Sequence, residues 1–152
     1  MTIGPDTVAT ADLRELLASH LRDMGAKTPP ECVHALGLEA YADPRITLYA
    51  ARQDGVLWGC GALKELAPDH GEIKSMRTAP DRLRQGVARA VLDFLLAEAR
   101  RRGYRRVSLE TGSSESFRPA RTLYEQTGFR PCAPFADYAP DPISAFFTME
   151  LA

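Results

Sequence analysis

The stretch from Gly71 to Ala88, GEIKSMRTAPDRLRQGVA, carries the pattern that decides the fold. It predicts a strand over 71–79, then a turn and a glycine-containing loop that opens into a helix at Gly86. The first N–H groups of a helix have no intrahelical acceptor, and the helix dipole makes that end partly positive. This order of parts indicates a site for a phosphate-bearing ligand. Glu72, in the strand, places an acid within reach of the loop.

Hydrophobic periodicity and turn residues predict the other elements. We expect helices at 10–24, 29–42, 86–102 and 116–127. We expect strands at 3–8, 46–52, 56–66, 71–79, 105–110, 129–132 and 143–151. Gln53-Asp54-Gly55 predicts a hairpin turn, and the strand–helix–strand unit after Gly71 predicts two parallel strands. The fold class is α/β, a mixed, mostly antiparallel sheet with helices on both faces, in a single domain over 1–152.

The composition is that of an ordinary globular protein, with 45% hydrophobic and 26% charged residues. The formal net charge of −1 gives no electrostatic reason to expect a nucleic acid partner. Cys32, Cys60 and Cys132 are widely spaced and odd in number, which favours buried thiols in a reducing compartment over a disulfide or zinc framework. The sequence shows neither a signal-peptide pattern nor an apolar run of ~20 residues. We therefore expect a cytoplasmic protein without a membrane or metal partner.

Two motifs in a fixed order carry a family resemblance. The first is Met76-Arg-Thr-Ala-Pro80 followed by Leu83-Arg-Gln-Gly-Val-Ala88, and the second is Ala120-Arg-Thr-Leu-Tyr-Glu-Gln-Thr-Gly-Phe129. Together they resemble the signatures of the GNAT family of acetyl-CoA-dependent N-acetyltransferases, over about residues 45–150. The chain departs from that pattern at Leu83, where the family has Gln or Arg, and at Phe117, where it usually has Asn.

The resemblance implies acetyl-CoA as co-substrate. Backbone N–H groups from Arg84 to Ala88 would hold its pyrophosphate, and the end of the strand would contact its pantetheine arm. The residues implied for cofactor binding are Met76, Arg77, Thr78, Arg82, Arg84, Gln85, Gly86, Val87, Ala88, Phe117 and Ala120. The alternatives are an ordinary helix start at Gly86 and simple core packing of the strand side chains.

The resemblance also implies the catalytic groups. Glu72 occupies the register of a glutamate that serves as general base in the histone-acetyltransferase-like branch, and Tyr124 matches the tyrosine that protonates the departing thiolate. Glu72 lies an even number of residues before Met76 and Thr78, so strand alternation predicts that all three face the same side. The alternatives are a surface glutamate beside Lys74 and a core tyrosine.

The expected activity is acetyl transfer to a primary amine of a small molecule or amino-acid-like acceptor, by direct attack in a ternary complex. Candidate acceptor contacts are Arg22, His34 and Tyr138. The alternatives are a non-catalytic acyl-CoA-binding or sensing domain, and acetylation of a protein lysine or N-terminus. The arginines between 100 and 106 are interpreted as a basic helix C-terminus instead of a nucleic-acid surface. The oligomeric state, including a homodimer, is left open.

Overall fold

Seven β-strands and three α-helices follow one another through the described residues, 1–27 and 38–151, of the computed structural model. The strands are β1 (Thr2–Asp6), β2 (Ile46–Gln53), β3 (Val56–Ala67), β4 (His70–Thr78), β5 (Arg106–Gly112), β6 (Arg130–Pro131) and β7 (Ser144–Glu150). The helices are α1 (Ala11–Lys27), α2 (Val87–Arg101) and α3 (Arg118–Thr127), with short 3-10 helices η2 (Leu38–Ala42), η3 (Pro80–Arg82) and η4 (Glu115–Phe117). The expected helix at 29–42 falls mostly on 28–37, outside the described residues, and its last part forms η2.

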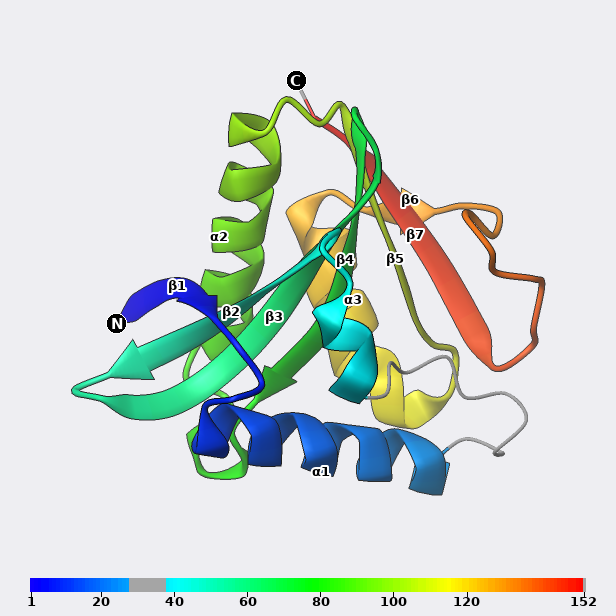
Figure 1. Cartoon of the computed structure of the whole chain (residues 1–152). Coiled ribbons are helices and arrows are strands. Elements are labelled where there is room, and N and C mark those ends of the chain that lie inside the picture. Colours follow the sequence, from blue (N-terminus) through cyan, green and yellow to red (C-terminus); the bar gives the residue numbers. More distant parts are fainter. Residues whose placement is uncertain (28–37, 152) are drawn as a thin grey trace.

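The strands form one mixed sheet in the order β1-β2-β3-β4-β5-β7-β6. Every neighbouring pair is antiparallel except β4 and β5. This exception follows from chain connectivity. After β4, the chain passes through α2, which returns it along the sheet before β5 begins, so β4 and β5 run in the same direction (Figure 1). The expected mostly antiparallel sheet with one parallel pair is confirmed.

The hairpin between β2 and β3 forms where the sequence predicted it. Asp54 and Gly55 both have positive φ, 52° and 78°, which is the requirement of the two-residue hairpin turn whose twist matches that of the strands. Aspartate followed by glycine meets this requirement at low steric cost.

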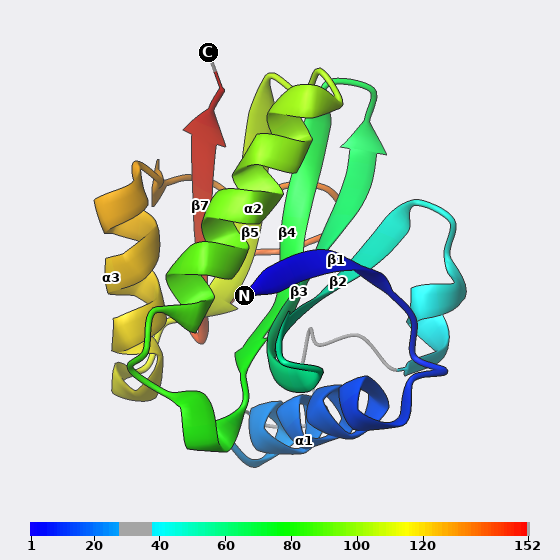
Figure 2. The ribbon, with the colours of Figure 1, turned by 90° about the vertical axis from the view of Figure 1, so that its left-hand side faces the viewer.

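The side chains of the sheet alternate between two hydrophobic cores. On β2, Leu48 and Ala50 join the core under α1, whereas Tyr49 and Ala51 join the core under α2 and α3. Figure 2 shows α2 crossing in front of β4 and β5. Helices therefore cover both faces of the sheet, as expected.

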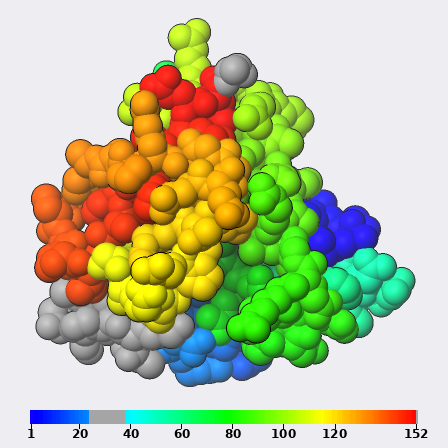
Figure 3. Space-filling view, turned by 180° about the vertical axis from the view of Figure 1, so that it is seen from behind, coloured from blue at the N-terminus to red at the C-terminus, as the bar shows by residue number. Residues whose placement is uncertain are grey.

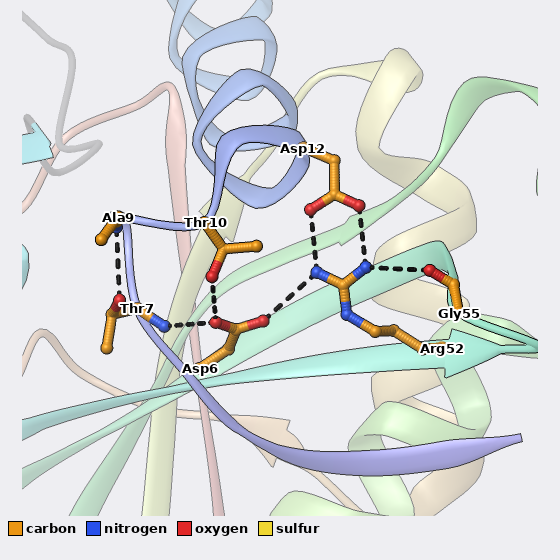
Figure 4. A network of polar contacts seen from close by, with 7 residues as sticks. All are labelled: Asp6, Thr7, Ala9, Thr10, Asp12, Arg52 and Gly55. Atoms are coloured by element: carbon orange, nitrogen blue, oxygen red, sulfur yellow. Dashed lines mark hydrogen bonds and ion pairs between the residues drawn. The ribbon is translucent and has the colours of Figure 1, made fainter.

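A polar network fixes the start of α1 to the β2–β3 hairpin (Figure 4). Arg52 donates two hydrogen bonds to Asp12, at 2.7 and 2.8 Å, and one to Asp6, at 3.3 Å. Asp6 in turn accepts a hydrogen bond from the Thr10 hydroxyl at 2.6 Å. The hydrogen bonds from Arg52 hold the pKa of Asp12 below its usual value. This network sets the position of α1 on its face of the sheet.

Glycines in β3 allow close approach of α2 and β4. An ideal Cβ built on Gly59 would lie 2.8 Å from Cγ1 of Val87 and 2.9 Å from the carbonyl oxygen of Arg77. Because the second contact is with a backbone atom, it could be relieved only by a shift of the main chain. Gly59 therefore brings β3 against both the start of α2 and the end of β4.

Gly59→Ala is expected to lower the free energy of unfolding by about 2 kcal/mol, because the added methyl overpacks this contact. Urea unfolding of the variant measures the loss. The matched control is Gly4→Ala, since a Cβ at Gly4 meets nothing within 4 Å. Equal stability of the two variants would contradict the close approach.

Candidate active site

A gap opens in the sheet between β4 and β5. The two strands pair only from His70 with Arg106 to Ile73 with Leu109. Beyond this point β4 remains paired with β3, and β5 with β7, so the facing edges of β4 and β5 separate (Figure 1). The backbone groups on these edges are placed to bind an extended ligand that adds like a strand.

A bulge at Ser75 lies on the β4 side of the gap. The register between β3 and β4 shifts between Cys60 and Ala62, and Ser75 has a φ of 58°. The Tyr41 hydroxyl and the Ser75 hydroxyl are hydrogen-bonded at 2.5 Å. Burial raises the pKa of Tyr41 to about 12. The bulge is therefore fixed from the α1 side by a side chain of η2.

The bulge corrects the expectation that Glu72 faces the same side as Met76 and Thr78. Met76 packs with the core under α2, and its sulfur lies 3.1 Å from an ideal Cβ on Gly61. Glu72 and Lys74 lie on the other face, because Ala62, the partner of Lys74, belongs to the core under α1. The extra residue in the bulge reverses the alternation, so counting residues along the strand gave the wrong face.

The loop before α2 has the backbone expected of an anion-binding helix start. Gly86 is the N-cap of α2 in the left-handed conformation, with φ of 81°, and no side chain caps the helix. Arg84 is also left-handed, with φ of 62°. An ideal Cβ on Gly86 would meet nothing within 4 Å, so the space beside the first N–H groups is open. These residues fit a pyrophosphate group.

The side chains of this loop point in different directions. The Arg82 guanidinium stacks on the Trp58 ring, 4.5 Å from its centroid. Leu83 is 59% exposed. Arg84, Gln85 and Ala88 lie on the surface or near it at the start of α2, whereas Val87 is buried in the core. Figure 3 shows the surface hollowed between this region, in green, and α3, in yellow.

Arg77 lies on the α1 side of the gap and forms an ion pair with Asp23 of α1. Its Nε is buried and has no hydrogen-bond partner among the described residues. Thr78, by contrast, pairs with Gly59 at the α2 side. The two neighbouring cofactor candidates therefore present their side chains to opposite faces.

Tyr124 is buried under α3 with 6% of its surface exposed. Its ring packs edge-on against Phe129, with centroids 5.8 Å apart. Its hydroxyl forms no hydrogen bond recorded within the described part of the chain. Burial raises the pKa of Tyr124 to about 12. The side chain is thus both a core aromatic and a phenol that keeps its proton.

The raised pKa of Tyr124 predicts a measurable titration. Between pH 9 and 11 the difference in phenolate absorbance between the native protein and Tyr124→Phe is expected to be close to zero, whereas in denaturant it appears near pH ~10. The pKa of Tyr124 is raised because burial disfavours the charged phenolate. If this absorbance difference developed in the native protein at the same pH as in denaturant, the buried environment of Tyr124 would be contradicted.

Two further cofactor candidates fix the start of α3 to the sheet. The Phe117 ring covers Gly112 at the end of β5, where an ideal Cβ would lie 2.1 Å from it. Arg121 donates hydrogen bonds to the carbonyl oxygens of Gly112 and Ser114, at 2.8 and 2.7 Å. Ala120 packs against the core below α3. Phe117, in place of the usual Asn, therefore has a packing role beside the gap.

Glu72 is almost completely buried, with 2% of its surface exposed. Its Oε2 accepts hydrogen bonds from Lys74 Nζ at 2.9 Å and from the Tyr138 hydroxyl at 2.7 Å. The structure thus brings together one catalytic candidate, Glu72, and one acceptor candidate, Tyr138. The ammonium of Lys74 supplies the opposite charge that a buried carboxylate requires. The alternative interpretation of Glu72 as a surface glutamate is wrong.

The other acceptor candidates are not brought to this cluster. Arg22 is exposed on α1 and pairs with Glu15 at 3.1 Å. His34 lies outside the described residues. The residues that sequence reasoning missed are Lys74 as a partner of Glu72 and Ser75 as the bulge. The contact of Lys74 with Glu72 could have been predicted, because residues two apart on a strand face the same side. The bulge at Ser75 could not, because no residue type at this position indicates one.

The cysteines of the described chain have no catalytic setting. Cys60 is 1% exposed, its thiol lies 3.4 Å from the carbonyl oxygen of Ser75, and burial raises its pKa to about 12. Burial also raises the pKa of Cys132. Neither thiol is therefore activated as a nucleophile.

The arginines near the end of α2 are engaged in structural contacts. Arg101 and Arg102 pair with Glu98, and Arg102 also donates to the hydroxyls of Thr47 and Tyr49, both at 3.0 Å. A hollow of about 720 Å³ at this end of the sheet is lined by both signs of charge: Arg100, Arg105, Arg106, Asp69 and Glu150. It lies at the opposite end of β4 from the gap. These contacts support the interpretation as a basic helix C-terminus.

The described residues contain no group of three or more His, Cys, Asp or Glu side chains arranged to hold a metal ion. Among the same residues, no helix is long and apolar enough to cross a membrane.

Comparison with known proteins gives concordant matches. The family profile described as "Acetyltransferase (GNAT) family" matches residues 12–129. The N-acetyltransferase YsnE of Bacillus subtilis (strain 168) is 52% identical over 99% of this chain and 100% of its own length. An IAA acetyltransferase of Azospirillum brasilense is 33% identical over 99% of this chain and 98% of its own. A GNAT family acetyltransferase of Elizabethkingia anophelis, solved with acetyl-CoA bound, superposes with a TM-score of 0.72 at 23% identity, over 99% of this chain and 97% of that one.

Proposed function

Since this chain belongs to the GNAT acetyltransferase family and is an N-acetyltransferase, we propose that it transfers the acetyl group of acetyl-CoA to a primary amine of a small molecule. The transfer takes place by direct attack in a ternary complex, because the described cysteines are not activated as covalent nucleophiles. The observation that carries the proposal is the buried carboxylate of Glu72, which lies one residue before the β4–β5 pairing ends and accepts both of its side-chain hydrogen bonds from described residues at Oε2.

Acetyl-CoA supplies the thioester from which the acetyl group is taken. The left-handed Gly86 and the uncapped N–H groups that follow it would hold the pyrophosphate, with Arg84 at the same helix start adding charge. The unpaired edge of β4 from Met76 to Thr78 would bind the pantetheine arm as an added strand. A backbone N–H near Met76 would donate to the thioester oxygen, where negative charge develops.

Glu72 accepts the proton that the acceptor ammonium must lose before it can attack. Oε2 is held by Lys74 and Tyr138, and Oε1 faces no donor within the described chain, so Oε1 is the atom that takes the proton. Glu72 and Tyr124 lie on opposite faces of the sheet, since Tyr124 belongs to the core under α2 and α3 whereas Glu72 faces the α1 side. The base and the phenol would therefore act on the reacting centre from two sides.

Tyr124 acts on the departing sulfur mainly as a hydrogen-bond donor. Its pKa of about 12 is well above that of an ordinary thiol, about 8.5, so the phenol retains its proton and the sulfur leaves as a stabilised thiolate. A hydrogen bond to a charged acceptor is stronger than one to a neutral acceptor. This role refines the expectation of a full proton donor.

The acceptor is a small molecule in this proposal, since a relative 33% identical to the chain is named "IAA acetyltransferase". The net charge of −1 likewise gives no long-range field for a strongly basic protein tail. The second candidate, a domain that binds acyl-CoA without turnover, is disfavoured by the buried and positioned Glu72.

The test is release of free thiol from acetyl-CoA in the presence of amino acids, polyamines, aminoglycosides or peptides. The proposal expects thiol release that depends on one class of small amine. Tight acetyl-CoA binding without release for any acceptor favours the sensing domain. Release with peptides alone favours acetylation of proteins.

A further inference from the structure

Three polar side chains from two distant segments meet on the face of the sheet opposite α2. Tyr138 comes from the segment between β6 and β7, and it donates to Glu72 Oε2 at 2.7 Å across 66 residues of sequence. Lys74 Nζ donates to the same Oε2 at 2.9 Å and to the Tyr138 hydroxyl at 2.8 Å. The three groups thus form a closed triangle in which each is bonded to both others.

The triangle is asymmetric about the carboxylate. Both donors bind Oε2, and neither binds Oε1. The side chains of Lys74 and Glu72 are only 10% and 3% exposed, so water contributes little to the orientation of this pair. Two donors on one oxygen fix the plane of the carboxylate and direct its other oxygen away from the triangle.

Tyr138 is itself rigidly held. Its ring lies edge-on to Phe135, with centroids 5.2 Å apart, and tilted against Phe146 of β7 at 5.5 Å. The Tyr138 N–H donates to the carbonyl oxygen of Phe135 at 3.0 Å. The end of the same segment is tied to β5, because the Ser113 hydroxyl donates to the carbonyl oxygen of Pro142 at 2.6 Å. The hydroxyl of Tyr138 therefore has a fixed position relative to the sheet.

We propose that Tyr138 and Lys74 are positioning residues, which orient Glu72 so that Oε1 receives the proton of the acceptor amine. This inference rests on the proposed function. It assigns Tyr138, expected from sequence to contact the acceptor, to the support of the base. The segment between β6 and β7 then contributes to the rate of the reaction through Glu72.

Several charged and titratable groups lie on the same side of the sheet as Glu72. The charged and titratable groups that face Glu72 or its partners on this side are His70 and Lys74 on β4, Lys64 on β3, Glu110 on β5, Tyr41 at the bulge, and Tyr138. Of these, Lys74 and Tyr138 are the two hydrogen-bonded to the Glu72 carboxylate within the described chain.

The first test is Tyr138→Phe, which removes one hydroxyl and keeps the ring packing. With the amine that the thiol-release screen finds to be acetylated fastest, kcat is expected to fall about 10-fold, with KM for the amine changed less than 2-fold. Lys74→Gln is expected to lower kcat as well.

The matched control is Tyr104→Phe, because the Tyr104 hydroxyl also donates to a glutamate, Glu65, at 2.9 Å, but on the other side of the sheet. This variant is expected to keep the wild-type kcat. A kcat of Tyr138→Phe equal to that of the control overturns the inference while leaving acetyl transfer itself intact. Absence of thiol release with every amine overturns the proposed function instead.

A double-mutant cycle separates support of Glu72 from direct acceptor binding. In a Glu72→Gln background, Tyr138→Phe is expected to change kcat less than 2-fold, because a residue that acts through Glu72 has nothing left to orient. If Tyr138→Phe still lowers kcat 10-fold in the Glu72→Gln background, Tyr138 does not act through Glu72 and the inference is overturned. If its effect is instead a raised KM for the amine, Tyr138 contacts the acceptor, and the inference is likewise overturned.

Discussion

Glu72→Gln is expected to lower kcat at least about 100-fold, which is the usual contribution of a general base. The amide has nearly the shape of the carboxylate but cannot accept the proton of the acceptor ammonium. Binding of acetyl-CoA is expected to be unchanged, because the residues proposed to hold the cofactor lie beyond the bulge, where Met76 and Thr78 face the opposite side of β4 from Glu72. Steady-state thiol release and direct titration with acetyl-CoA measure the two quantities separately.

The control for this variant must also lose a partly buried ion pair. Glu98→Gln removes the partner of Arg101 and Arg102 on α2, with the Glu98 side chain 13% exposed, and is expected to keep kcat within 2-fold. Both variants are compared at a temperature at which circular dichroism shows them folded, since Lys74 loses its counter-charge in Glu72→Gln. Full turnover by folded Glu72→Gln would remove the base role.

Tyr124→Phe is expected to lower kcat by roughly 10- to 100-fold, the rate equivalent of one hydrogen bond to a charged group. The loss falls on the step in which the sulfur departs, so acetyl-CoA affinity is expected to stay within 2-fold of the wild type. The ring packing against Phe129 is retained, and stability should change little. Single-turnover acetylation isolates this step from release of the products.

Tyr49→Phe provides the comparison for Tyr124→Phe, because Tyr49 is a buried tyrosine of the same core whose hydroxyl is bonded to Arg102. Its turnover is expected to remain near that of the wild type. If the two variants lose activity equally, the loss belongs to the core and not to the leaving sulfur.

Features determined by local backbone conformation were predictable from sequence. The Asp54-Gly55 turn and the left-handed Gly86 before α2 both depend on a glycine that accepts positive φ, and both lie where the pattern indicated. The same holds for the parallel β4–β5 pair, which follows from the strand–helix–strand order. The loop and its helix were therefore placed correctly.

Features that depend on a single inserted residue or on distant contacts were not predictable in this way. Ser75 adopts a positive φ that serine rarely takes, so nothing in the residue type indicated the bulge or the change of face after it. The contact of Tyr138 with Glu72 spans 66 residues and depends on how the β6–β7 segment packs. The identity of the candidate residues was thus available from sequence, but their mutual arrangement was not.

The bulge at Ser75 also has a consequence for how such an enzyme can diversify. After the bulge, β4 presents Met76 and Thr78, proposed to bind the donor, on one side of the sheet, and before it the proposed base Glu72 lies on the other side. Substitutions that adapt the base side to a new amine leave the donor side chemically untouched. A graft of the 132–143 segment from a relative should therefore change kcat through the contact of residue 138 with Glu72, while the affinity for the acyl donor is inherited unchanged.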